Sequence, residues 1–248
     1  PAFVTESEEQ GAKQSSELDS TRETAQTAHT KQTTTLNSDL YKESSEGLDS
    51  KSNQYSEVGN ANNKQPAARP CYKQTELGEI PEGWEVSTVN NVSLVPMQNG
   101  LFYEPQRKGK GVPLINVGDM YTSAPIDVSS LDLFDATESE IKVFKVQKGD
   151  LFFTRSSIVP SGIAYCNTFK EENAVAVFDS HLIRVRPDQK VMDADFLYLN
   201  CIASHSRRFL ISSAKTATMT TIDQGAIKKC PVLVPPLKEQ TAIANVLS

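Results

Sequence analysis

Hydrophobic side chains are distributed unevenly along this chain. Residues 1–70 contain nine Val, Ile, Leu, Met, Phe, Trp, Tyr or Cys side chains against 29 Ser, Thr, Asn or Gln side chains. The nine hydrophobic positions follow neither the helical period of about 3.6 residues nor the two-residue period of a strand. A segment of this kind cannot bury enough apolar surface to offset the entropy lost on ordering. We therefore predict a disordered Ser/Thr/Asn/Gln-rich tail or linker over residues 1–71.

Short hydrophobic runs bounded by turn residues begin after residue 71 and predict strands. A turn in IPEGW precedes the first clear run, because Pro81 presets φ and Gly83 admits positive φ. A second turn at Asp179–Ser180 divides one long run into two strands. The predicted strand regions are WEVSTV (84–89), VPLINVGDM (112–120), GDLFFTRSS (149–157) and NAVAVFDSHLIRVRP (173–187).

One stretch has the spacing of a helix. DADFLYLNCIASHSRRFLISSA (193–214) places hydrophobic residues about one turn apart, and Asp193 or Asp195 can cap its start. A polar, Thr-rich loop, a short helical turn and the strand PVLVP (231–235) follow. Several strands around one central helix predict an α/β domain of the mixed α+β kind over residues 72–234.

The last stretch of the chain, VPPLKEQTAIANVLS (234–248), predicts the first turns of a helix over residues 235–248. Pro235 and Pro236 end the preceding strand and preset the start of the helix. Glu239 suits the positive N-terminal end of the helix dipole. An apolar stripe then begins at Ile243, Val246 and Leu247. This stripe either packs on the domain itself or continues into a longer helix that packs on another one.

Composition narrows the class of protein. The formal net charge is −6, and residues 1–70 carry 7 basic and 11 acidic residues, so about −4 of it lies in the predicted tail. No apolar run approaches the roughly 20 residues that span a bilayer, and PAFVTESEEQ does not resemble a signal peptide. We expect a cytoplasmic protein without membrane contact, given as a piece of a longer chain. Its four cysteines, without zinc or C-x-x-C spacing, are expected to be reduced: Cys71, Cys166, Cys201 and Cys230.

Residues that would form a catalytic or metal site are not grouped in the sequence. His29, His181 and His205 have no partners at metal-ligand spacing. The chain has no P-loop, no dinucleotide fingerprint and no H-E-x-x-H motif. TRSSIVPSG (154–162) lacks the G-x-S-x-G pattern that exposes an activated serine. We therefore expect no catalytic residue, metal or cofactor in this chain.

Basic and hydroxyl residues gather at three places. The region 204–230 holds five basic residues against one acidic residue, PQRKGKG (105–111) holds three more, and FTRSS (153–157) ends a predicted strand. Arg and Lys contact phosphates and guanine, and Ser and Thr contact other base edges. The pattern is compatible with DNA binding, although runs of charge are also common on solvated surfaces.

Four segments, taken in order, resemble a known family. They are YKQTELGEIPEGWEV (72–86), KGDLFFTRSS (148–157), DADFLYLNC (193–201) and TATMTTIDQGAIKKCPVLVPPLKEQTAIANVLS (216–248). The last contains a strand followed by Pro-Pro-Leu-x-Glu-Gln and the start of a helix. Over residues 72–248 the chain resembles the DNA specificity subunits of type I restriction–modification systems, and residues 1–70 lie outside the resemblance.

The resemblance implies a fold and a set of partners. In this family, target recognition domains alternate with long spacer helices, and each domain reads one half of a split DNA sequence. Residues 72–234 would be one compact recognition domain with a twisted, largely antiparallel sheet and flanking helices, and 235–248 the start of a conserved spacer helix. The implied partners are double-stranded DNA, methyltransferase (modification) subunits and a restriction subunit. S-adenosylmethionine, ATP and Mg would belong to those subunits, and the chain itself would be non-catalytic.

Within this hypothesis, residue types suggest the contacts. Major-groove or phosphate contacts are expected from two groups of residues: Arg155, Ser156 and Ser157, and Lys215, Thr216, Thr218 and Thr220. Phosphate contacts are expected from the loop residues Arg107, Lys108 and Lys110. The partner-binding helix is expected to use Glu239, Gln240, Ile243, Val246 and Leu247. For each DNA contact a plain surface role is a comparable alternative.

Two other functions remain open from the sequence. The chain could be the specificity part of a single-chain restriction–methyltransferase, with residues 1–70 as a linker. It could also be a non-enzymatic surface interaction protein with a Ser/Thr-rich stalk.

Overall fold

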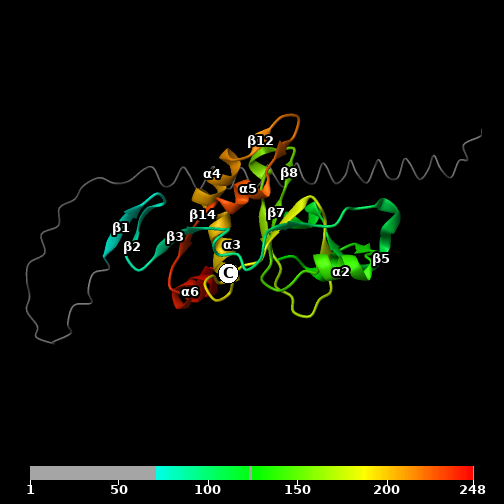
Figure 1. Cartoon of the computed structure of the whole chain (residues 1–248), viewed down its shortest axis with the longest axis horizontal. Coiled ribbons are helices and arrows are strands. Elements are labelled where there is room, and N and C mark those ends of the chain that lie inside the picture. The colour runs from blue at the N-terminus through cyan, green and yellow to red at the C-terminus, as the bar shows by residue number, and fades with distance from the viewer. Residues whose placement is uncertain (1–70, 123–124, 248) are drawn as a thin grey trace, which may run out of the picture. The chain divides into compact units, whose positions relative to one another are not determined.

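The computed structural model describes residues 71–122 and 125–247. The tail predicted over residues 1–71 lies outside the described residues, Cys71 excepted. The described chain alternates short strands with helices, as Figure 1 shows. The pairings between its strands are antiparallel except that between β10 (Val177–Phe178) and β5 (Lys108–Ile115). The mixed α+β class predicted from the sequence is confirmed.

A four-stranded antiparallel sheet forms the centre of the domain. Its two inner strands, β7 (Leu151–Thr154) and β11 (Leu182–Val185), are buried at every residue. Successive side chains of a strand point to opposite faces, so Phe153 enters one hydrophobic core and Phe152 enters another. Burial on both faces explains why β7 is a continuous apolar run. The order is β4 (Gln98–Asn99), β11 (Leu182–Val185), β7 (Leu151–Thr154) and β9 (Cys166–Thr168).

Four helices and a strand pair contribute to the core on one face. Phe196 and Leu197 of α3, Leu210 of α4 and Ala244 of α6 are buried there. Strand β3 pairs with β14, so the first part of the domain is joined to the segment just before α6. The elements are β3 (Glu85–Thr88), α3 (Ala194–Ile202), α4 (Ser204–Ser212), α5 (Gln224–Lys228), β14 (Pro231–Val234) and α6 (Leu237–Leu247).

A second small sheet and helix α2 lie beside the other core (Figure 1). Strand β5 is bulged between Lys108 and Val112. Gly111 has φ of 92°, and a Cβ there would lie 2.3 Å from the carbonyl oxygen of Phe134, so only glycine fits. Besides β5 and β10, this part contains β6 (Leu133–Phe134), α2 (Glu138–Phe144) and the 3-10 helices η1 (Pro105–Arg107), η2 (Val117–Met120) and η3 (Val128–Ser130).

Two outer elements complete the described chain. Strands β1 (Tyr72–Thr75) and β2 (Gly78–Pro81) form an antiparallel hairpin. A three-stranded sheet has the order β12 (Lys215–Thr216), β13 (Thr220–Thr221) and β8 (Ser156–Ser157). The 3-10 helix η4 (Pro160–Gly162) follows β8 closely.

The helices and one loop differ from the sequence prediction. Helix α2 was not predicted, although Thr137 and Glu140 form a capping box that the sequence shows as T-x-x-E. The single helix predicted over 193–214 is two helices, because Ala203 has an extended ψ of 151° between them. Asp193 caps the first of these by accepting the backbone N–H groups of Asp195 and Phe196. The predicted Thr-rich loop contains the β12–β13 hairpin.

Candidate nucleic-acid interface

The three-stranded sheet brings together two segments that are about sixty residues apart in the chain. Strand β8, directly after β7, pairs with β13, which pairs in turn with β12. Two rows of side chains therefore cross the three strands: Ser156, Thr221 and Lys215 in one, and Ser157, Thr220 and Thr216 in the other. The structure thus unites the two groups that the sequence singled out separately.

The two rows face opposite ways, because side chains alternate along a strand. Thr220 is 2% exposed, and its hydroxyl lies 3.1 Å from that of Thr216. Ser157 donates its hydroxyl proton to the carbonyl of Val159 at 2.7 Å. The Ser156, Thr221 and Lys215 row instead lines an open hollow of about 400 Å³. We call the side of the sheet that carries this row the outer face.

The structure therefore corrects the prediction for Thr220. Its side chain is buried under the sheet and cannot reach a ligand on the outer face. Thr221, which the sequence analysis passed over, takes that position. The two-residue period of a strand over TMTT (218–221) puts Thr220 and Thr221 on opposite faces, but only the pairing of β13 with β8 shows which of them is buried. Thr218 lies at the exposed turn of the hairpin.

Arg155 links the central four-stranded sheet to the three-stranded sheet of β12, β13 and β8, which we call the outer sheet. Its backbone N–H donates to the carbonyl of His181 at 2.8 Å, and its carbonyl accepts the N–H of Ile222 at 3.0 Å. These two bonds fix the backbone while the side chain stays exposed. One guanidinium N–H points toward the carbonyl of Ser180 at a long 3.4 Å. Most of the guanidinium donors of Arg155 thus remain available at the hollow.

His181 also lines the hollow, held by a buried carboxylate. Asp179, 4% exposed, accepts the backbone N–H of His181 at 2.7 Å, and the same oxygen lies 2.7 Å from His181 Nδ1. The ring itself is 61% exposed. The Asp-Ser-His turn before β11 therefore fixes the imidazole with Nε2 available. The sequence analysis gave His181 no binding role; its position after a turn is the available signal.

The charge of the outer face is mainly positive. The Lys215 ammonium is 85% exposed and lies 3.9 Å from the Asp223 carboxylate. An exposed pair at this distance contributes little and is easily displaced. Asp223 also accepts the N–H of Ala226 at 2.9 Å as the cap of α5. Lys215 is thus free to turn toward an anionic ligand.

Three loop residues were expected to contact phosphates: Arg107, Lys108 and Lys110. They lie on η1 and β5, away from the outer sheet (Figure 1). Arg107 donates to the Glu104 and Glu140 carboxylates and to the carbonyl of Asp135. Its guanidinium also lies 4.5 Å from the centre of the Phe134 ring. All five of its N–H donors are therefore engaged within the domain. The prediction of Arg107 as a phosphate contact is corrected to a structural role.

The charges around Arg107 shift each other's protonation. Its guanidinium donates to Glu140 and lowers the pKa of that carboxyl to about 2, although partial burial opposes the shift. The same bond raises the pKa of Arg107. Lys108 and Lys110 lie 2.8 Å from Asp132 and 2.9 Å from Asp135 in exposed ion pairs. Their role as phosphate contacts stays a prediction.

A second basic residue turns out to be structural. Arg207, within the positive region 204–230, donates to the carbonyls of Ser161, Ile163 and Ala164 at 2.6–2.8 Å. Burial lowers the pKa of this guanidinium. Arg207 therefore holds the loop that follows β8. Its effect on any ligand would be indirect.

Helix α6 contacts its own domain. Gln240, predicted to bind a partner, is fully buried. Its side chain accepts the N–H of Asp193 and donates to the carbonyls of Val191 and Pro235. The structure corrects this residue to an internal one, because periodicity alone does not reveal that its amide pairs with three backbone groups.

The other helix residues divide into two groups. Glu239 accepts the indole N–H of Trp84 at 2.9 Å, and Ile243 packs on the core that contains α3. Val246 is 81% exposed and Leu247 is 63% exposed. The part of the apolar stripe left for another surface is therefore its last turn, at Val246 and Leu247.

The described residues contain neither a metal cluster nor a membrane-spanning helix. Within 71–122 and 125–247, no group of three or more His, Cys, Asp or Glu side chains is placed to hold a metal ion. Among the same residues, no helix has the length and apolar character to cross a bilayer.

Residues 81–248 match the model of the type I restriction modification DNA specificity domain. This chain belongs to that family. The match begins at the last residue of β2 and therefore covers the central sheet, the outer sheet and α6. The family resemblance inferred from the four sequence segments is confirmed.

Relatives within the type I restriction modification family are distant in sequence. The EcoKI specificity subunit of Escherichia coli K12 is 26% identical over 61% of this chain and 33% of its own length. The StySPI specificity subunit of Salmonella potsdam is 26% identical over 66% of this chain and 35% of its own length. A crystal structure of an HsdS subunit from Thermoanaerobacter tengcongensis, 17% identical, aligns over 71% of this chain and 39% of that one with a TM-score of 0.49. The chain thus spans about a third of these curated relatives.

Proposed function

We propose that this chain is the DNA-reading part of a type I restriction–modification specificity subunit and recognises one half of a bipartite target. Membership of the type I restriction modification DNA specificity family supports the assignment to a type I system. The observation that carries the local assignment is the outer face, where Ser156, Thr221 and Lys215 form one row beside Arg155 and His181. These residues come from three separate parts of the chain.

The chemistry of the outer face suits base edges and phosphates. Serine and threonine hydroxyls can donate or accept, so they match either kind of major-groove edge. Arginine and lysine bind guanine or phosphate, and the phosphate contribution does not depend on sequence. The net charge of −6 argues against indiscriminate DNA binding, so a local positive face is the form that recognition would take. Backbone bonds from the buried central sheet hold this face in place.

The partners follow from the same proposal. Val246 and Leu247 would continue the apolar stripe into a spacer that docks methyltransferase and restriction subunits. Those subunits would supply methylation from S-adenosylmethionine and ATP-driven cleavage with Mg. The chain itself would contribute position and sequence choice rather than chemistry.

Salt-dependent DNA binding by the chain, assembled with its methyltransferase subunits, tests the local assignment. Arg155→Ala combined with Lys215→Ala should weaken binding to a target duplex. If both side chains contact phosphates, the slope of log affinity against log salt should fall by about 1.8, at roughly 0.9 per contact. If Arg155 reads guanine instead, the slope should fall by about 0.9 and the base preference at one position should relax.

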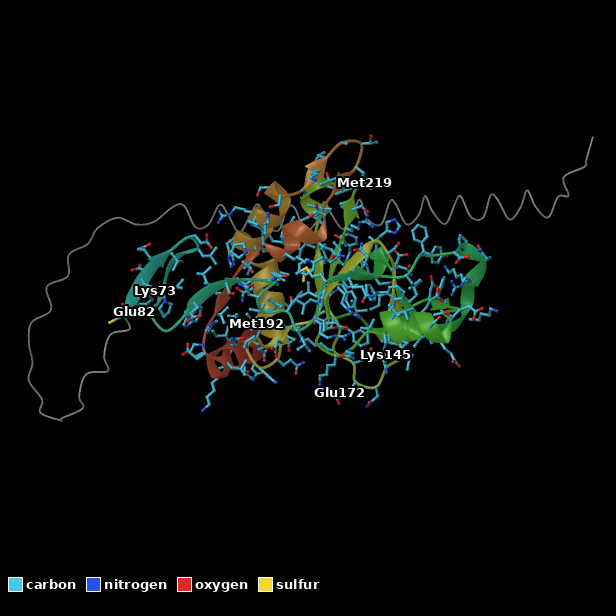
Figure 2. All side chains as sticks on the ribbon, in the orientation of Figure 1. Lys73, Glu82, Lys145, Glu172, Met192 and Met219 are labelled. Atoms are coloured by element: carbon cyan, nitrogen blue, oxygen red, sulfur yellow. The ribbon has the colours of Figure 1, made fainter. Side chains whose placement is uncertain are left out.

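A control with the same loss of charge is Lys145→Ala combined with Lys148→Ala. Lys148 pairs with Glu172, and Figure 2 labels Lys145 and Glu172 well away from Met219 of the outer sheet. This control should leave the slope and base preference unchanged. If the two double variants behave alike, the assignment of the outer face is wrong.

A further inference from the structure

Strands β8 and β13 end at the pair of Ser157 and Thr220. Ile158 and Met219 are the next residues of the chain at that end of the sheet, just outside the two strands. Across the hairpin, Ala217 donates its N–H to the carbonyl of Met219 at 3.3 Å. Three apolar residues, Ile158, Met219 and Ala217, therefore follow the last paired rows at this end of the sheet. Figure 2 labels Met219 beside the hairpin loop that protrudes there.

Met219 belongs to the outer face. It lines the same hollow as Arg155 and Lys215, as does Thr221, two residues further along the chain. The outer face thus places one apolar side chain next to its polar, positive row.

Two of these apolar side chains are unusually exposed for their residue types. Ile158 is 76% exposed and Met219 is 45% exposed. Met219 sits beside cationic and hydroxyl side chains that suit DNA. On the major-groove edges of the four bases, thymine is distinguished by its C5 methyl group, and apolar side chains recognise it. Methionine is flexible and polarisable and adapts well to such a group.

We propose that Met219 reads a thymine through its C5 methyl group. This rests on the proposed DNA-binding function of the outer face and adds a specificity-determining contact to it. Met219 and Thr221 are two residues apart in the chain, which at strand spacing is about 6.8 Å. That distance matches about two base-pair steps, since neighbouring base pairs are about 3.4 Å apart. Where the strands follow the groove, the thymine lies about two steps from the base that meets the Ser156 row.

Deoxyuridine provides the test, because it keeps every hydrogen-bonding group of thymine and lacks only the methyl. The target would first be selected from random duplexes by the chain assembled with its methyltransferase subunits. Each thymine of the selected duplex would then be replaced singly. At one position, the replacement should weaken binding by the wild-type complex about fourfold, the equivalent of about 0.8 kcal/mol for one buried carbon group.

The same duplexes with Met219→Ala separate a methyl contact from a general loss of binding. The Met219→Ala complex should bind the thymine and deoxyuridine duplexes equally at that position, while Met219→Leu should keep most of the difference. Val143→Ala, which shortens an equally exposed apolar side chain on α2, should behave as wild type.

The outcomes distinguish this inference from the proposed function. A selected target for which no replacement separates wild type from Met219→Ala would overturn the thymine contact and leave DNA recognition standing. Failure of the wild-type complex to select any sequence would overturn both.

Discussion

Replacing Gln240 by alanine should destabilise the domain, although the residue lies on a helix whose neighbours are exposed. The side-chain amide makes hydrogen bonds to the N–H of Asp193 at 2.8 Å and to the carbonyls of Val191 and Pro235 at 3.0 and 2.8 Å. Asp193 is itself the cap of α3. One amide thus ties α6 to the start of α3 and to the end of β14.

The magnitude follows from those three bonds. Each hydrogen bond contributes a net ~1 kcal/mol, so Gln240→Ala should lower the free energy of unfolding by about 3 kcal/mol. The loss is set by the backbone groups left unpaired in a buried site, where Gln240 is fully shielded from water. At a urea m-value of about 2 kcal/mol/M, the unfolding midpoint should fall by about 1.5 M.

Urea unfolding of the whole chain, followed by far-UV circular dichroism and by tryptophan fluorescence, measures this change. Trp84 is the single tryptophan, and its indole N–H donates to Glu239 on α6, so its emission reports on this helix. Thr241→Ala is the matched control, because it removes an exposed hydroxyl contact to Asp193 at 3.1 Å one residue away. The control should change stability by less than about 0.5 kcal/mol.

A midpoint for Gln240→Ala within about 0.3 M of wild type would refute this reasoning, because by the ordinary m-value it corresponds to less than one hydrogen bond. Normal stability combined with lost assembly with methyltransferase subunits would instead restore Gln240 as a partner contact.

Three further predictions concern other parts of the domain. The pKa of Glu140 is about 2 because Arg107 donates to it, below its unfolded value of about 4.3, so this contribution is present above pH 4.3 and is lost as pH falls toward 2. The stability gap between wild type and Glu140→Gln should therefore shrink between pH 6 and pH 3 in urea titrations, and a constant gap would contradict the assignment. Arg207→Lys should cost about 2 kcal/mol in thermal or urea unfolding, since one ammonium cannot replace a guanidinium bonded to three carbonyls, whereas Arg208→Lys, at an exposed neighbour, should be neutral. Maleimide should label Cys71 alone in the native chain and all four thiols after unfolding, because the other three are buried; rapid native labelling of a second thiol would refute the core packing.

Local sequence patterns predicted much of the fold. The run Leu151–Thr154 and the residues around the Asp179 turn became strands because continuous apolar segments between turn residues are buried on both faces of a sheet. The sequence offered Asp193 or Asp195 as a cap, because a carboxylate before a helix accepts orphan N–H groups, and the structure shows Asp193 in that role. The helix after Pro236 follows from the same local rules.

The sequence predicted only part of the candidate site. Residue type selected Arg155, Ser156 and Lys215, and the fold places these three around one hollow. Residue type could not show that Thr220 points inward, because its direction depends on the pairing of β13 with β8, some sixty residues away. It also could not show that the donors of Arg107 are satisfied by acceptors from other segments.

By itself, the sequence determined the class of fold, the location of about half of the described strands and the family, because those depend on patterns within a few neighbouring residues. Only the tertiary structure decided which polar side chains are available and which are used internally. Gln240 and Arg107 look like surface residues by spacing and charge. In the fold, both side chains instead make hydrogen bonds to backbone or carboxylate groups of their own domain. Met219 looks like an ordinary loop residue, and the pairing of β13 with β8 brings its hairpin to the hollow that Arg155 also lines. The physical reason is that hydrogen-bond satisfaction and the direction of a strand face are properties of pairs of segments, and a single segment does not contain them.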